Sequence, residues 1–379
     1  MAALMIPSPS VLDPRDPKLP AQIQGIPKSA GVYLLAPLAG APYLGWSSSL
    51  SRRLSRLLLR YGDTHSRLST VRQNLATVEF WLTGSQLETS ILLYSLTRQY
   101  DPDHYEKRLK LRAPWFVSLL EFDPFPRLSV QNSIPRRRAA TFGPFRNRDA
   151  ADAFCFETSG LFQIRRCSER LAVSADHPGC MYGEMNLCMR PCQLAVSREE
   201  YATEVARVRD FLATNGHHQL AVLIAARDRA SEETDFEQAA RLHKQLEKVK
   251  AVGSLRDDVV CDVDRLNGIA LTRGARLRSV ALWPMLAGYW QDPLYFDFSQ
   301  PESQGKSLDR ELRDSLSRHL QNPRSEGVRV EQIALLTRWY FSSWRDGDWF
   351  PFRGLEDLNY RRLVRGISNL LRGMPAAGG

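Results

Sequence analysis

Four cysteines within residues 167–192 constrain this chain more than any other feature of its sequence. The run CSERLAVSADHPGCMYGEMNLCMRPC has the spacing C-x12-C-x7-C-x3-C, and its cysteines are Cys167, Cys180, Cys188 and Cys192. Thiolate sulfur is the ligand type that selects zinc or iron–sulfur clusters. Gly179, Gly183 and Pro191 supply turns between the cysteines, so we expect this segment to fold back around one metal centre.

Disulfides and buried thiols are the alternatives to a metal centre. The first residues, MAALMIPSPSVLDPRDPK, contain prolines and charges rather than an apolar signal segment, and no stretch approaches the length of a membrane span. We therefore expect a cytoplasmic protein without a membrane partner, in which thiols stay reduced. Buried thiols suit isolated cysteines such as Cys155 and Cys261. The short CxxC spacing that favours zinc is missing, which favours an iron–sulfur cluster, with zinc as the alternative.

The length and net charge of the chain limit its number of domains and the class of its partners. The 379 residues predict two or three domains. The net charge is +9, mostly from arginine, which pairs with phosphate and stacks on bases. A GC-rich genome also favours arginine, so position matters more than number. The basic clusters lie in the first half of the chain and mark it as the side that faces nucleic acid; they are Arg52, Arg53, Arg56 and Arg60, then Arg136, Arg137 and Arg138, then Arg146, Arg148, Arg165 and Arg166.

Periodicity predicts most of the secondary structure. Residues 1–25 are proline-rich and predict a flexible arm. Strands are expected at 31–38, 43–47, 77–84, 115–122 and 126–133, with helices at 47–61, 86–102 and 149–162 and a loop at 141–145. Residues 197–225 predict a helix with a break at Asn215-Gly216, and 231–253 a helix pair or one long helix. Strands are expected from 259 to 298, then helices at 307–320 and 331–344.

Two tyrosines and an arginine form a candidate chemical site. Tyr33 and Tyr43 fall on neighbouring strands of a predicted hairpin, and Arg53 lies on the helix that follows. Such a set suits phosphodiester hydrolysis, in which tyrosine orients water, arginine stabilises developing charge and a carboxylate holds a divalent metal. Each tripeptide, GVY or YLG, is common on its own and equally describes a buried strand tyrosine.

In this order, the pieces resemble the GIY-YIG nuclease domain. The later run TFGPFRNRDAADAFCFETSGLFQIRRC and the cysteine spacing resemble the segments that follow this domain in UvrC, the bacterial nucleotide-excision-repair subunit, whose family carries an iron–sulfur cluster there. The run TDFEQAARLHKQLEKVKAV resembles the UVR motif, by which UvrC engages UvrB. The resemblance extends from about Lys28 to about Trp344. It implies DNA and UvrB as partners, with a UvrB contact formed by Phe236, Ala240, Leu246 and Val249.

The resemblance also implies the domain order. We expect a flexible arm at 1–25, a GIY-YIG-like domain at 26–110, a strand-rich linker with the cysteine segment at 111–196, a helical region with the UVR-like motif at 197–256, and an α+β module at 257–379. The fold class is thus α/β and α+β multidomain. The RNase H-like and helix-hairpin-helix half of UvrC has no counterpart in this sequence.

Departures from the family pattern put the first nuclease site in doubt. Counting back from Pro102 places Leu93 in the slot of the catalytic glutamate. Glu88 lies five residues earlier, which turns it about 140° away on a helix. Trp46 and Tyr105 replace the lysine and asparagine usual in the family. Mg²⁺ prefers oxygen ligands, so without a carboxylate nothing obvious would hold it.

Three functions therefore stay open. One is a structure-specific endonuclease that uses Tyr33, Tyr43, Arg53 and, as the remaining carboxylate, Glu88 with Mg²⁺. A second is a non-catalytic adaptor that binds DNA and UvrB. A third is a zinc protein whose cysteines only hold a loop together.

Overall fold

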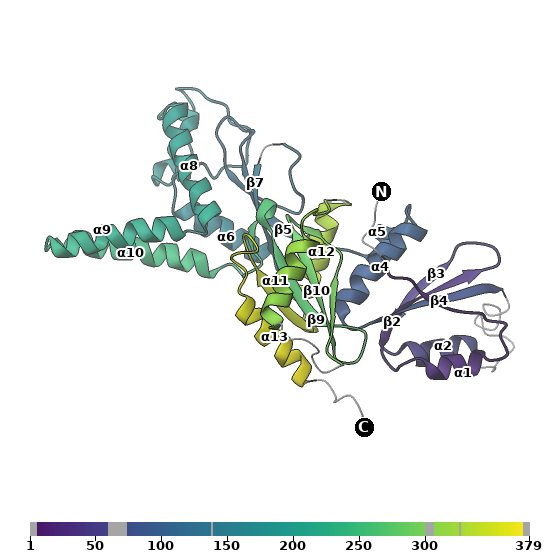
Figure 1. The fold of residues 1–379 in the computed structure, drawn as a ribbon. Coiled ribbons are helices and arrows are strands. Elements are labelled where there is room, and N and C mark those ends of the chain that lie inside the picture. Colours follow the sequence, from purple (N-terminus) through teal and green to yellow (C-terminus); the bar gives the residue numbers. More distant parts are fainter. Residues whose placement is uncertain (1–5, 60–73, 138, 300–306, 326, 374–379) are drawn as a thin grey trace. The chain divides into compact units, whose positions relative to one another are not determined.

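The computed structural model describes residues 6–59, 74–137, 139–299, 307–325 and 327–373. The chain divides into two compact units, one made of residues 1–112 and 267–379 and the other of residues 113–266. The second unit is therefore an insertion in the sequence of the first, and each is described here separately (Figure 1).

The N-terminal part of the first unit is an antiparallel sheet with helices on both faces. Its strand order is β1-β4-β2-β3. Alternating residues of β2 feed two apolar clusters: Tyr33 and Leu35 pack with α1 and α2, whereas Val32 and Leu34 pack with α4. The elements are β1 (Ser10–Leu12), α1 (Leu19–Gly25), β2 (Ala30–Pro37), β3 (Tyr43–Ser47), α2 (Leu50–Leu58), β4 (Leu75–Thr83), α4 (Gln86–Tyr100) and α5 (Tyr105–Leu109).

The prediction of a flexible arm over residues 1–25 is wrong for its second half. Strand β1 pairs with β4, and helix α1 packs against α2 through Leu19 and Ile23, both fully buried. Leu19 and Ile23 are four residues apart and so share one face of the helix. Prolines at 14, 17 and 20 masked this short apolar pattern, although a proline in the first turn of a helix is well tolerated.

The C-terminal part of the first unit is a second antiparallel sheet, of order β11-β10-β9-β13, with β12 also paired to β10. Helix α13 covers this sheet, and its Leu363 and Ile367 are fully buried in the core. Strand β13 and helix α13 were not predicted from the sequence. The elements are β9 (Gly268–Arg273), β10 (Ser279–Leu286), β11 (Tyr289–Trp290), β12 (Leu294–Asp297), α11 (Leu308–His319), α12 (Arg329–Tyr340), β13 (Gly347–Pro351) and α13 (Tyr360–Arg372).

The second unit is built on a sheet of order β6-β5-β7-β8 that is packed against α6 (Arg148–Gly160). Its strands are β5 (Trp115–Leu120), β6 (Leu128–Gln131), β7 (Ala139–Phe145) and β8 (Cys261–Asp262). Residues 141–145 belong to strand β7, so the prediction of a loop there is wrong. Phe142 and Phe145 are buried, and pairing with β5 overrides the turn tendency of Gly143-Pro144.

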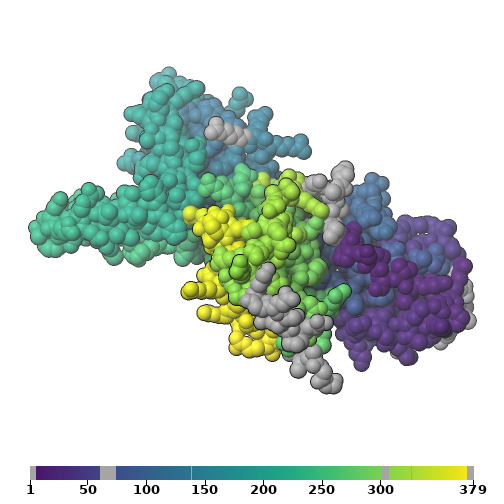
Figure 2. Space-filling model, viewed as in Figure 1, coloured from purple at the N-terminus to yellow at the C-terminus, as the bar shows by residue number. Residues whose placement is uncertain are grey.

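Three long helices follow the cysteine segment: α8 (Arg198–Thr214), α9 (His217–Glu232) and α10 (Phe236–Ser254). The predicted break at Asn215-Gly216 is confirmed, since both residues adopt the left-handed conformation. A second break falls at Thr234, and Asp235 caps α10. The helical hairpin is therefore α9–α10 rather than a pair within 231–253; its two helices lie side by side (Figures 1 and 2).

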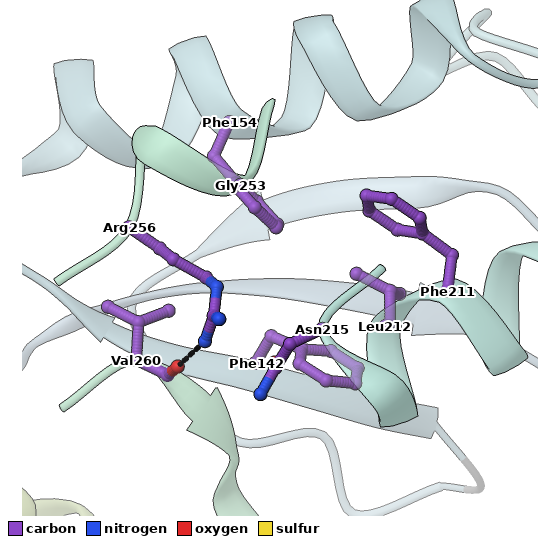
Figure 3. A pocket seen from close by; sticks show the side chains of 8 residues that line it. All are labelled: Phe142, Phe154, Phe211, Leu212, Asn215, Gly253, Arg256 and Val260. Carbon is purple, nitrogen blue, oxygen red and sulfur yellow. Dashed lines mark hydrogen bonds between the residues drawn. The ribbon is translucent and has the colours of Figure 1, made fainter. Parts of the chain in front are cut away.

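Side chains fill nearly all of the space where α6, α8 and the C-terminal end of α10 meet. Phe142, Phe154 and Phe211 line this junction, and at one side of it the Arg256 guanidinium donates to the Val260 carbonyl at 3.3 Å (Figure 3). The remaining gap is about 10 Å³. That space suits one water molecule, so this junction is part of the core and not a ligand site.

Candidate nuclease-like and cysteine sites

The structure brings Tyr33, Tyr43 and Arg53 together. The Tyr33 hydroxyl accepts a 3.0 Å hydrogen bond from Arg53 Nε, and the two tyrosine rings lie 6.2 Å apart between centroids. Pairing of β2 with β3 sets Tyr33 opposite Gly45 and Leu35 opposite Tyr43. Ser49 precedes the helix that carries Arg53. These local features place the three side chains on one face of the sheet.

Gly45 is required by the position of Tyr33. A Cβ atom at residue 45 would lie 2.7 Å from the Tyr33 hydroxyl oxygen, because that ring crosses over the neighbouring strand. The glycine of the YLG tripeptide thus makes room for the Tyr33–Arg53 pair. Tyr33 is buried, while Tyr43 is 51% exposed and is the part of the set that solvent reaches most readily.

Electrostatics favour a neutral phenol at Tyr33. Burial raises the pKa of Tyr33, and the hydrogen bond from Arg53 lowers it by less. The hydrogen bond to Tyr33 raises the pKa of Arg53, which therefore stays charged. A neutral hydroxyl beside a guanidinium offers donors to a phosphate oxygen. It does not supply a strong base for activating water.

Glu88 is not part of this set. Its Oε2 accepts from the Gly84 backbone N–H at 2.7 Å, and its Oε1 accepts from the Tyr295 hydroxyl at 2.8 Å. Burial raises the pKa of Glu88. The carboxylate is thus held within the first unit by β12. The prediction that Glu88 joins Tyr33, Tyr43 and Arg53 finds no support in these contacts.

Helices α2 and α4 pack on opposite faces of the N-terminal sheet. Arg53 belongs to α2, on the face of Tyr33, whereas α4 covers the face of Val32 and Leu34. Leu93, in the expected glutamate slot, packs against the second of these clusters. An apolar residue there fits its surroundings, because a carboxylate would lose solvation among leucines.

Helix α4 instead joins the two parts of the first unit. The Gln86 N–H donates to Asp346 at 2.6 Å, and the Tyr94 hydroxyl donates to Glu331 at 2.7 Å. Tyr105 stands where the family has asparagine, and it donates to the same carboxylate at 2.8 Å. Sequence reasoning missed this network, since its acceptors lie more than 200 residues away along the chain.

The four clustered cysteines lie in an irregular segment with only two short helical turns, α7 (Met181–Glu184) and η1 (Pro191–Gln193). Cys188 and Cys192 are buried, and Cys167 and Cys180 are half-buried. Asn186, Arg190 and Leu194 all adopt the left-handed conformation. Such conformations are unfavourable for residues with side chains and gather at ligand sites.

The thiols of this segment affect one another. Burial raises the pKa of Cys188, the Arg190 N–H at 3.4 Å lowers it, and the thiols of Cys167, Cys180 and Cys192 raise it further. In the described residues, however, no three His, Cys, Asp or Glu side chains lie close enough to hold one metal ion. The side chains themselves suit a thiophilic metal chemically, because four thiols fall within one short segment and two of them are buried.

Arg165 is fixed inside the second unit. It is 2% exposed and donates to the carbonyls of Phe125 and Glu169 and to the carboxylate of Asp123. Its NH1 also lies 3.7 Å from Cys167 Sγ. The prediction that Arg165 faces DNA is therefore wrong, because its donors are used within the protein and its side chain is inaccessible.

Other arginines of the basic clusters have mixed roles. Arg166 donates to the Ser159 carbonyl, and Arg148 pairs with Asp152 on the surface. Arg60 and Arg138 lie outside the described residues. For the exposed arginines of these clusters, contact with nucleic acid stays a prediction.

The residues expected to contact UvrB separate into two groups. Phe236 is 71% exposed, and Ala240 is exposed as well. Leu246 and Val249 are 1% and 2% exposed, so the prediction that they belong to the contact surface is wrong. They lie toward the C-terminal end of α10, which packs against α9 and α6.

Within the described residues, no helix is both long enough and apolar enough to cross a bilayer.

Comparison with known proteins finds one family model and several relatives that match parts of this chain. Residues 115–211 match the middle domain of the UvrC/Cho excinuclease family. The UvrABC system protein C of Methanothermobacter thermautotrophicus is 29% identical over 265 residues, which cover 68% of this chain and 43% of that protein. Its namesakes from Yersinia pseudotuberculosis and Edwardsiella ictaluri are 28% and 29% identical, and each match covers 61% of this chain and 38% of the relative. No solved structure matches.

The structure and these matches define a multidomain α/β and α+β protein with an excinuclease-type middle domain. More particularly, the chain is similar to UvrABC system protein C over about two thirds of its length. It spans less than half the length of the curated relatives that it matches.

Proposed function

We propose that this chain is a DNA-binding protein of nucleotide excision repair that acts in the cytoplasm and does not cut DNA at its first, GIY-YIG-like site. The position of Glu88 is the observation that supports the absence of DNA cutting at this site. Glu88 lies on α4, on the opposite face of the sheet from Tyr33 and Arg53, and Leu93 occupies the expected glutamate slot. A hydrolytic centre without a carboxylate lacks an oxygen ligand for Mg²⁺.

The proposal that the chain binds DNA rests on charge and on the retained tyrosine–arginine pair. The net charge of +9 favours a polyanion. The Arg53 guanidinium and the exposed Tyr43 ring offer a phosphate donor and a stacking surface in one place. In this role, Arg53 and Tyr43 position a DNA strand without breaking its backbone.

We further propose that the α9–α10 hairpin docks on UvrB through Phe236 and Ala240. A phenylalanine exposed at the start of α10 has no packing role in the chain itself, and aromatic anchors of this kind dominate protein interfaces. The four cysteines would hold an iron–sulfur cluster, or alternatively zinc. Such a centre would stabilise the loop between α6 and α8, because metal–sulfur bonds would join its four cysteines.

A residual endonuclease is the second candidate. It is favoured by the Tyr33–Arg53 hydrogen bond, which keeps two of the three expected catalytic side chains together. In that case Mg²⁺ would take its carboxylate from a residue other than Glu88.

An incision assay separates the two candidates. The substrate is an end-labelled duplex with a bulky lesion, incubated with UvrA, UvrB, ATP and Mg²⁺, and the Methanothermobacter relative serves as the positive control. We expect the wild-type chain to bind the duplex and UvrB but to leave both strands intact. Incision by the wild type that is lost in Arg53→Ala would establish the second candidate instead.

Binding is measured in parallel on the same proteins. DNA affinity should fall steeply with salt concentration, and Arg53→Ala should weaken it. Failure to bind either duplex or UvrB would contradict the proposed function as a whole.

A further inference from the structure

The first unit contains a cavity of about 180 Å³ that the nuclease-like site does not use. It lies among strand β4, helix α4 and the sheet that contains β10 and β12. Its walls include Phe80 and Trp81, Glu88, and Trp283 and Tyr295. The cavity therefore brings aromatic rings from both parts of the unit to one buried carboxylate.

The aromatic walls offer ring surface more than polar groups. The indole N–H of Trp81 donates to the Pro7 carbonyl at 2.7 Å, and that of Trp283 donates to the Thr272 hydroxyl at 3.1 Å. The Tyr295 hydroxyl donates to Glu88. With these donors engaged, the rings are left to contact a flat apolar surface by stacking or edge-to-face packing.

Glu88 is the charged group of the cavity, and its side chain is almost fully buried. A carboxylate has about four lone-pair positions, and the hydrogen bonds from Gly84 and Tyr295 use two of them. The remaining positions accept hydrogen bonds, so a ligand beside Glu88 must donate. Because burial disfavours the charge of Glu88, a donor there would also stabilise its ionised form.

Cavity size limits the ligand to a single ring. An apolar cavity of about 150 Å³ accommodates benzene, so about 180 Å³ accommodates roughly seven or eight non-hydrogen atoms. Cytosine is a ring of this size, and its exocyclic amino group donates to carboxylates. Uracil and thymine present a carbonyl oxygen at the same place, which a carboxylate repels.

We propose that this cavity binds a cytosine base, with its ring between the aromatic side chains and its amino group donating to Glu88. The cavity is partly open to solvent, so only the base enters it and the sugar stays outside. The base is either that of a free nucleoside or one turned out of a DNA strand. The second source rests on the proposed DNA-binding function. Turning a base out of a duplex costs unstacking and unpairing energy, and this cost is lowest for an unpaired or mismatched base. An unpaired cytosine is therefore the preferred DNA form.

The test uses the full chain and its tryptophan fluorescence, since two tryptophans line the cavity. Cytidine is expected to give a saturable change at concentrations where uridine and thymidine give none. Duplexes with one unpaired cytosine, one unpaired thymine or full pairing distinguish the two sources. Tighter binding of the unpaired cytosine duplex than of the other two, by tenfold or more, would identify DNA as the source; equal binding of all three, with cytidine bound, would identify the free nucleoside.

Glu88→Gln tests the role of the carboxylate. The amide keeps the shape and presents an N–H₂ group, so we expect cytidine binding to fall at least tenfold and the preference to shift toward uridine. A purely structural role for Glu88 would not reverse this preference. Asp309→Asn is the matched control, since it removes a surface ion pair with Arg313 in the same unit outside the cavity and should leave cytidine binding unchanged.

A second variant keeps the test valid if Glu88→Gln unfolds. Ser95 also lines the cavity and is buried, so Ser95→Leu should fill it and abolish cytidine binding without changing the charge. Absence of cytidine binding to the wild type, or equal binding of cytidine and uridine, would overturn the inference. If duplex DNA and UvrB still bind, the proposed function survives that result.

Discussion

Glu331 accepts hydrogen bonds from the hydroxyls of both Tyr94 and Tyr105, at 2.7 and 2.8 Å. Arg98 donates to Tyr94 at 3.0 Å, which adds a positive charge to the group. These single residues decide how the N-terminal sheet meets the C-terminal one. Burial and Glu331 together raise the pKa of Tyr105 to about 12, so its hydroxyl keeps the proton well above the pKa of a free tyrosine.

This pKa shift predicts a pH-dependent contribution to stability. Because the folded-state pKa of Tyr105 is higher than its unfolded value of 10.0, its contribution is full below pH 10 and is lost as the pH rises toward 12. Tyr105→Phe should therefore lower the free energy of unfolding by about 1 kcal/mol at pH 9. The difference between the two proteins should shrink by pH 11.

Urea unfolding of the wild type and Tyr105→Phe at several pH values measures this difference. Comparing two proteins cancels the titration of the other tyrosines. A difference that stays constant from pH 9 to pH 11 would contradict the hydrogen bond to Glu331.

The irregular segment between α6 and α8 contains the four clustered cysteines. Cys188 is buried, and the other three thiols of the segment raise its pKa. We expect Cys188→Ser to lose most of the bound iron or zinc, because one ligand of the proposed centre is removed. Cys261→Ser is the matched control, since Cys261 lies in β8, outside the segment.

Anaerobic purification, absorbance near 400 nm and elemental analysis distinguish the metals. Brown protein with iron supports the cluster, and colourless protein with zinc supports the alternative. If the wild type contains neither, or if both variants retain the wild-type metal content, the cysteines do not form a metal centre.

The α9–α10 hairpin combines an exposed end with a packed one. Leu246→Ala should lower the free energy of unfolding by about 2–5 kcal/mol, because it leaves a cavity in a buried contact. Phe236→Ala should leave stability within about 0.5 kcal/mol of the wild type, since this side chain is exposed. It should nevertheless weaken UvrB binding on the order of tenfold.

Thermal unfolding and surface-immobilised UvrB give the two readouts for each variant. Unchanged UvrB affinity in Phe236→Ala would place the docking surface elsewhere on the chain.

At the scale of the whole molecule, the first unit is discontinuous in sequence and the second is continuous. Residues 113–266 should therefore fold as an isolated fragment. Residues 1–112 alone should not be stable, because α4 would lose its hydrogen bonds to Tyr295, Glu331 and Asp346 and would expose the apolar wall of the cavity. Co-expression with 267–379 should restore it.

Circular dichroism during heating and size-exclusion chromatography of each fragment check this prediction. Cooperative unfolding of 1–112 alone, near the melting temperature of the full chain, would show that the C-terminal part is not needed for its stability.

Much of the local structure follows from the sequence. The caps at Ser85, Asn147 and Ser197 and the break at Asn215-Gly216 act within a few residues, so they can be predicted from sequence. The hairpin that sets Tyr33 beside Arg53 is likewise local, since only one turn and strand β3 lie between Tyr33 and the helix of Arg53. These features depend on interactions that the chain makes with its near neighbours.

The tertiary structure alone decided what those elements do. The sequence did not reveal that α4 packs against the C-terminal sheet, that Arg165 is buried or that Leu246 lies inside the hairpin. Each outcome depends on partners far away in the sequence, such as Tyr295 for Glu88. Burial and pairing of polar groups are set when distant segments meet, and the same residue types would suit either an exposed site or an internal contact.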